Sequence, residues 1–144
     1  MRDALGGTVN VVIIVMFIVI ALGYITFNIN YTKAFRVNDK IVTLFEKYKG
    51  NCLGSTKCAN EIKLYAGELG YKSDARFTCP SGFGKQLGIY CLKTVNVKNN
   101  SAIKESNAKY FVIVTKTKFS IPIISNIMDL DVFSVRGSTK TIYT

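Results

Sequence analysis

The side chains best suited to chemistry in this 144-residue sequence are four cysteines and a few carboxylates, because the chain contains no histidine. Histidine is the commonest general base, so Ser-His-Asp and Cys-His nucleophiles and histidine-containing zinc sites are excluded. Glu61 and Glu68 share one face of a predicted helix, and Asp129 and Asp131 flank a leucine. No second reactive feature accompanies either pair, so we interpret both as surface charge. We expect no catalytic residue and no cofactor.

The cysteines are Cys52, Cys58, Cys79 and Cys91, an even set within a short part of the chain. Such a set is typical of disulfides in an oxidising compartment. Cys52 and Cys58 are near enough to close a small loop, and Cys79 and Cys91 are placed to tie a loop to a strand. Three pairings are possible, and the sequence does not choose among them. The spacing contains no CxxC pair, which argues against zinc.

The element that dominates the N-terminal part is an uncharged segment, 9–27, with the sequence VNVVIIVMFIVIALGYITF. A helix of this length measures about 28 Å and just crosses a hydrocarbon core of about 30 Å. It lacks the polar stripe of a buried core helix. We therefore predict a leader, 1–8, followed by a transmembrane helix, 9–27. Ala21-Leu22-Gly23 resembles a signal-peptide cleavage site, but apolar residues continue past it, so a retained anchor is preferred.

Two rules disagree about the side of the membrane on which the C-terminal part lies. Several basic side chains follow the apolar segment, whereas only Arg2 precedes it. The positive-inside rule would therefore keep the C-terminal part in the cytoplasm. The cysteines favour an oxidising space. We follow the cysteines and expect a single-pass protein with a cytoplasmic N-terminus and an extracytoplasmic C-terminal domain.

Beyond the anchor, the pattern predicts two helices and then strands. An amphipathic extension covers 28–51 and ends at Gly50-Asn51, and a domain, 52–144, follows. In that domain we predict a helix from Thr56 to Leu69, a loop at 71–88 and strands at 88–97, 110–119 and 131–143. Pro122 favours a loop or edge segment between the last two strands. Helices followed by strands predict the α+β class with a small antiparallel sheet.

This order of a leader, a half-apolar helix, a disulfide-bearing domain and a terminal sheet resembles the type IV pilin-like proteins. More narrowly, FSIPII at 119–124 followed by VFSVRGST at 132–139 looks like the ending of the tight-adherence (Tad) pseudopilins. The resemblance implies a non-enzymatic, TadE-like minor pseudopilin or assembly factor of a Tad-type pilus or secretion apparatus. The implied partners are the lipid bilayer and other pilin-like subunits or assembly-platform membrane proteins.

The leader departs from the family pattern at one place. Gly6 and Gly7 stand where pilin-like precursors are cleaved, but Val11 and Val12 occupy the positions at which the mature family chain carries glutamate. This departure argues against cleavage by a prepilin peptidase and against ordinary incorporation into a fibre. The alternative is that Gly6-Gly7 form a flexible leader.

The charge balance suggests a second hypothesis. The net charge is +10, and residues 52–144 carry 13 basic against 6 acidic side chains, a net of +7. An anchored binding domain could use such a surface to contact an anionic polymer, phospholipid head groups or DNA. Lys116 and Lys118 share one face of a predicted strand, and Lys93 and Lys140 are expected neighbours. No nucleic-acid-binding motif is present, so nucleic acid is not the expected partner and a solvated surface is preferred.

Overall fold

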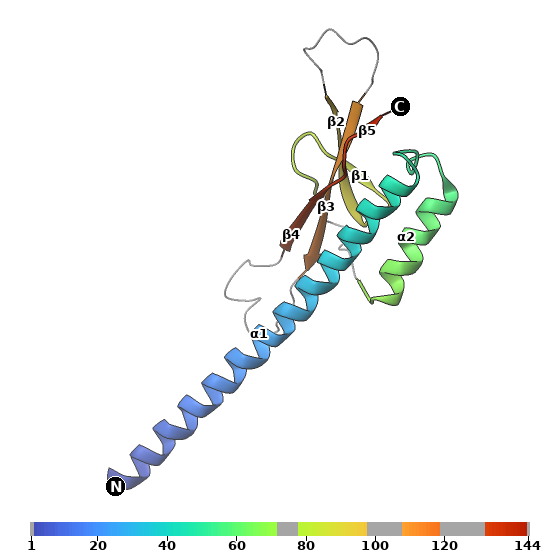
Figure 1. Cartoon of the computed structure of the whole chain (residues 1–144). Coiled ribbons are helices and arrows are strands. Elements are labelled where there is room, and N and C mark those ends of the chain that lie inside the picture. Colours follow the sequence, from blue (N-terminus) through green and yellow to red (C-terminus); the bar gives the residue numbers. More distant parts are fainter. Residues whose placement is uncertain (1, 72–77, 98–107, 119–131, 144) are drawn as a thin grey trace.

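The computed structural model has one long helix, with a short helix and a small sheet packed against the half of the long helix that is distant from the N-terminus (Figure 1). The structure describes residues 2–71, 78–97, 108–118 and 132–143. The elements in these ranges are α1 (Arg2–Lys47), α2 (Thr56–Glu68), β1 (Gly84–Gln86), β2 (Tyr90–Val97), β3 (Ala108–Lys118), β4 (Val132–Ser138) and β5 (Ile142–Tyr143). The predicted α+β class is confirmed.

Helix α1 has 46 residues and is therefore about 69 Å long at about 1.5 Å per residue. It begins at Arg2, so the segment expected as a leader is continuous with the helix. Its end is fixed by a left-handed turn, in which Lys49 and Gly50 have φ values of 48° and 80°. The backbone N–H of Gly50 donates to the carbonyl oxygen of Phe45 at 2.8 Å and satisfies one of the last carbonyls of the helix.

The C-terminal half of α1 is the spine of the hydrophobic core. Phe45 is fully buried, and its ring lies 5.3 Å from that of Phe111 and 6.2 Å from that of Tyr90. Helix α2 covers one flank of α1, and its N-cap is Ser55, whose side chain accepts from the N–H of Cys58. The buried core residues of the two helices are Ala34, Val37, Ile41, Leu44, Phe45, Cys58, Ile62 and Ala66.

The strands form one antiparallel sheet in the order β1-β2-β3-β4, and β5 pairs with β3 beyond the end of β4. Paired residues of such a sheet point to the same face, and successive residues alternate between faces. One face, with Tyr90, Leu92, Ile113 and Val135, packs against α1. The other face carries Cys91 and Val114.

Two strand predictions differ from the structure. β1 lies in a stretch predicted as a loop, and the strand predicted at 131–143 is divided into β4 and β5. The division occurs at Thr139, whose N–H donates to the carbonyl oxygen of Phe111 at 2.9 Å and whose Oγ1 accepts from the N–H of Phe111 at 3.0 Å. These two hydrogen bonds lie between the end of β4 and the start of β5 and separate the two strands. The segment around Pro122 and the residue Asp131 lie outside the described residues.

Candidate functional site

The N-terminal half of α1 is exposed along almost all of its length for which burial is described. Between Gly7 and Lys47 the most apolar window has a mean hydropathy of 2.7 and is 0% buried. Phe17 is 71% exposed, Met16 65% and Ile20 63%. By length and composition, α1 is therefore a candidate single-pass membrane anchor.

An aromatic junction joins the bare half of α1 to the domain. The ring of Phe27, the last residue of the apolar segment, lies 4.9 Å from that of Phe133 at the start of β4, in an edge-to-face arrangement. It also lies 6.1 Å from the ring of Tyr31. The first buried residue of α1 is Ala34 among those whose burial is described. The sheet thus touches α1 at the point where the apolar segment ends.

Two polar side chains near this junction form hydrogen bonds within the helix. Thr26 Oγ1 donates to the carbonyl oxygen of Leu22 at 2.9 Å, and Asn28 Nδ2 donates to that of Tyr24 at 3.0 Å. Internal bonding of this kind is what a polar group needs close to hydrocarbon. α1 therefore passes through the junction without a break.

Two disulfides hold the connections of the domain. Cys52–Cys58 closes the turn between α1 and α2, and Cys79–Cys91 ties the segment before β1 to β2. The predicted disulfides are present, and the structure selects one of the three pairings that the sequence left open. All cysteines are paired, and no group of three or more potential ligands for a metal ion occurs among the described residues.

A basic surface surrounds the second disulfide on the sheet face away from α1, which we call the open face. Lys93 Nζ and Arg136 Cζ lie 5.7 Å and 6.0 Å from the centroid of the Phe83 ring. Lys116 Nζ donates to the carbonyl oxygen of Thr78 at 2.6 Å. Within 78–97, 108–118 and 132–143 no side chain is acidic, and the basic ones are Lys85, Lys93, Lys109, Lys116, Lys118, Arg136 and Lys140.

The structure brings together only part of the predicted basic patch. Lys93 and Lys116 point to the open face. Lys118 is two residues after Lys116 on β3, so its backbone position, opposite Val132, belongs to the same face. Lys140 follows β4, and its backbone N–H donates to Glu46 Oε1 on α1 at 2.9 Å. The sequence reasoning missed Arg136, because only the strand register reveals that it lies opposite Val114.

The predicted carboxylate pairs do not form a reactive site in the described residues. Glu61 Oε1 accepts from the Tyr48 hydroxyl at 3.0 Å and joins α2 to α1, and this bond raises the pKa of Tyr48. Glu68 is exposed at the end of α2. Asp129 and Asp131 lie outside the described residues. Gly6 and Gly7 lie within α1, and open space surrounds the position of a Cβ on Gly7.

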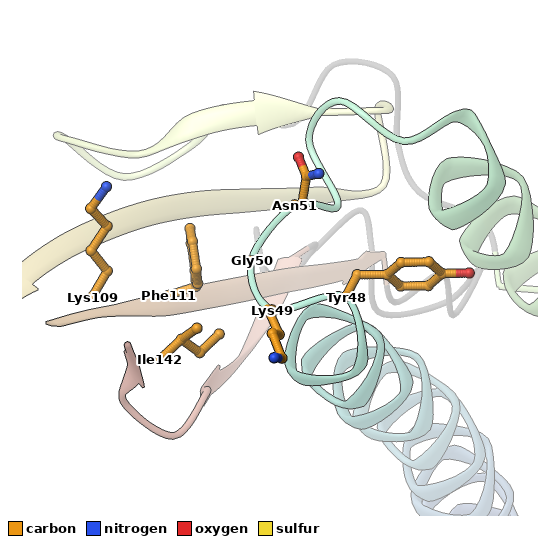
Figure 2. Close-up of a pocket in the computed structure, with 7 residues that line it drawn as sticks. All are labelled: Tyr48, Lys49, Gly50, Asn51, Lys109, Phe111 and Ile142. Carbon is orange, nitrogen blue, oxygen red and sulfur yellow. The ribbon is translucent and has the colours of Figure 1, made fainter. Parts of the chain in front are cut away.

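An open pocket of about 440 Å³ lies where α1 ends (Figure 2). Phe111 and Ile142 form an apolar side, and the hydroxyl of Tyr48 points away from them. The lining contains two lysines and no carboxylate or thiol; its residues are Tyr48, Lys49, Gly50, Asn51, Lys109, Phe111 and Ile142. The acid–base groups of this lining are Tyr48 and the two lysines, and the Tyr48 hydroxyl is engaged by Glu61.

No family model matches the chain, and no curated protein and no solved structure matches it.

Proposed function

We propose that the chain is a membrane-anchored, pilin-like subunit or assembly factor of a Tad-type surface pilus or secretion apparatus. One observation carries the proposal: a single helix supplies both a bare apolar half and the spine of a disulfide-bearing domain. In such a protein the anchor and the domain cannot move independently, because no break in α1 separates them.

The anchor is the working surface in this proposal. An exposed apolar surface as long as 9–27 is stable only in lipid or against other apolar helices. The partners that fit it are the bilayer and the anchors of neighbouring subunits or of assembly-platform proteins. With oxidised cysteines, the domain belongs on the extracytoplasmic side and the N-terminus in the cytoplasm.

Membrane insertion is tested by charge substitution. Ile14→Lys combined with Ile18→Lys adds roughly 6 kcal/mol to the insertion free energy. We expect this variant to be released from membranes at alkaline pH, whereas the wild type stays in the pellet. The matched control is Leu64→Lys, which changes a side chain 67% exposed on α2 and leaves retention unchanged. Release of the wild-type chain would overturn the anchor.

The assignment to a surface apparatus requires a second experiment. Thiols are blocked in membranes, and the protein is then analysed by non-reducing intact mass. We expect four oxidised cysteines. A mass equal to that of a chain that starts after Gly6 or Gly7 would show processing. Four free thiols would place the domain in the cytoplasm and overturn the pilus proposal. Deletion of the gene is expected to abolish the surface appendage, and its full retention would overturn the assembly role.

A further inference from the structure

The membrane-proximal end of the domain can be placed along the bilayer normal. If 9–27 crosses the hydrocarbon, Phe27 marks its edge, and Phe133 contacts Phe27. Phe133 pairs with Thr117, and the next pair along β3 and β4 is Lys116 with Ser134. Successive pairs are about 3.4 Å apart, so Lys116 lies one short step beyond the edge of the apolar segment. This position is within the head-group region, which is about 5–8 Å thick on each side.

Two cations of α1 reach the same region. Lys33 and Arg36 follow Phe27 by about 9 Å and 14 Å along the helix axis, and long basic side chains extend toward an interface. Lys33 Nζ lies 3.7 Å from the position of a Cβ on Gly70, just after α2. The neighbouring residue Tyr71 donates its hydroxyl to the carbonyl oxygen of Lys116 at 2.5 Å. Lys33, Lys116 and the end of α2 therefore share one level.

Exposed aromatic side chains of α1 mark the same boundary. Tyr24 is 68% exposed on the apolar side of Phe27, and Tyr31 is 45% exposed beyond it. Phe35, one turn further, is 54% exposed although it lies beside the buried Ala34. Tyrosines that bracket the end of a spanning segment are typical of the interface between a membrane and water. A membrane interface at this level would give the exposed rings of Tyr31 and Phe35 a favourable environment.

We propose that Lys33, Arg36 and Lys116 form a basic collar that binds the phosphate groups of anionic phospholipids in the bilayer that holds α1. This inference rests on the anchoring part of the proposed function. Two exposed carboxylates are close to these residues in the sequence: Asp39 follows Arg36 by three residues on α1, and Glu68 ends α2. Each cation near a negatively charged surface contributes about 1 kcal/mol of attraction. The collar holds the domain against the membrane, at a height fixed by the rigid helix.

Position favours the bilayer over a dissolved polyanion. A free polymer would bind the strongest accessible positive surface wherever it lies, including Lys93 and Arg136 on the open face. The collar instead lies at the level of the lipid phosphates in the bilayer that holds the anchor. Its partner is thus at high effective concentration whenever α1 is inserted.

The test measures lipid selectivity of the full-length chain in bilayers. Spin-labelled phosphatidylglycerol and phosphatidylcholine report the motionally restricted lipid around the protein at low and high salt. We expect a preference for phosphatidylglycerol of about threefold at low salt, which falls toward unity in high salt because exposed charges are screened. In the collar variant, Lys33→Gln, Arg36→Gln and Lys116→Gln, the preference is expected to disappear. If that variant does not fold, Arg36→Gln alone, at an exposed position, is expected to lower the preference partway.

A matched variant removes the same charge from the far end of the domain: Lys47→Gln, Lys49→Gln and Lys57→Gln, all at exposed positions. It is expected to retain the preference of the wild type. Equal loss in both variants would overturn the collar and assign the effect to net charge. An inserted wild type without preference would overturn the collar and leave the anchor intact, whereas a wild type released at alkaline pH would refute both. Salt-sensitive retention of the solubilised chain on heparin or DNA, without lipid preference, would also overturn the collar.

Discussion

Asn38 is the polar residue whose removal tests the packing of α1 on the sheet most directly. It is 3% exposed, and its Nδ2 lies within hydrogen-bonding distance of three oxygens. These are the carbonyl oxygens of Ile113 at 3.2 Å and Val135 at 3.1 Å, and Thr115 Oγ1 at 3.3 Å. One amide therefore bridges the helix to both β3 and β4. The perturbation is Asn38→Leu, which has a similar size but no donor.

The magnitude follows from the bonds that are lost. An amide has two N–H groups, and each buried hydrogen bond contributes about 0.5–1.5 kcal/mol net. Oxygens left without a donor add about 1–2 kcal/mol of desolvation cost. We therefore expect Asn38→Leu to lower the free energy of unfolding by about 2–4 kcal/mol. Thr115→Val removes one acceptor of Asn38 and a bond to the carbonyl oxygen of Ala34, and should cost about 1–2 kcal/mol.

The assay is urea unfolding of the full chain in detergent micelles, followed by the near-ultraviolet circular dichroism of the tyrosines. The double variant should cost at least about 0.5 kcal/mol less than the sum of the single ones, because the two residues share a bond. The control is Asn28→Leu on the same helix, where the amide bonds only its own helix. A loss below about 0.5 kcal/mol for Asn38→Leu, equal to that control, would refute the bridging role.

Three further predictions concern the domain. Gly137→Ala should lower the free energy of unfolding by about 1–3 kcal/mol, because its Cβ would overlap the buried side-chain amide of Asn38 on α1. Gly67→Ala, which has open space around it, should be neutral or stabilising in a thermal melt. Burial raises the pKa of Tyr71 to about 12, so the folded state keeps a proton that the unfolded state loses near pH 10. The free energy of unfolding should therefore be constant below pH 10 and fall between pH 10 and 12. The fall should be less steep in Tyr71→Phe, and an unchanged slope in that variant would contradict this prediction. Replacing Cys79 and Cys91 by alanine, which opens a loop with a sequence separation of 12, should cost about 3 kcal/mol by urea titration, and no loss would count against the disulfide.

The helices and two strands were predictable because their signals are local. A run without charge, a change to amphipathic spacing and Gly50 locate α1, and the predicted second helix differs from α2 by one residue. β2 and β3 begin and end within two residues of the prediction. These elements follow from periodicity, which any window of the chain displays.

The remaining features depend on contacts between distant residues. The division between β4 and β5 is set by bonds between Thr139 and Phe111, which are far apart in sequence. The open face combines residues of three strands, and the alternation within one strand cannot reveal which lysine or arginine of another strand lies opposite. The choice of disulfide pairing follows from the same register, which places Cys91 in the row of the sheet that faces the segment containing Cys79. A single sequence contains no signal for such register.

Some of the basic residues that follow the anchor make contacts within the folded domain, and these contacts form on either side of the membrane. Lys40 Nζ lies 5.5 Å from the ring centroid of Tyr65 on α2, and Lys47 Nζ lies 5.5 Å from that of Tyr48. Lys33 lies beside Gly70 at the end of α2. A cation–π contact contributes about 0.5–1 kcal/mol at an exposed site, and the contact between Lys40 and Tyr65 supports the packing of α2 on α1. Lys40 thus has a structural role apart from any effect on orientation, and we follow the disulfides in proposing the extracytoplasmic orientation.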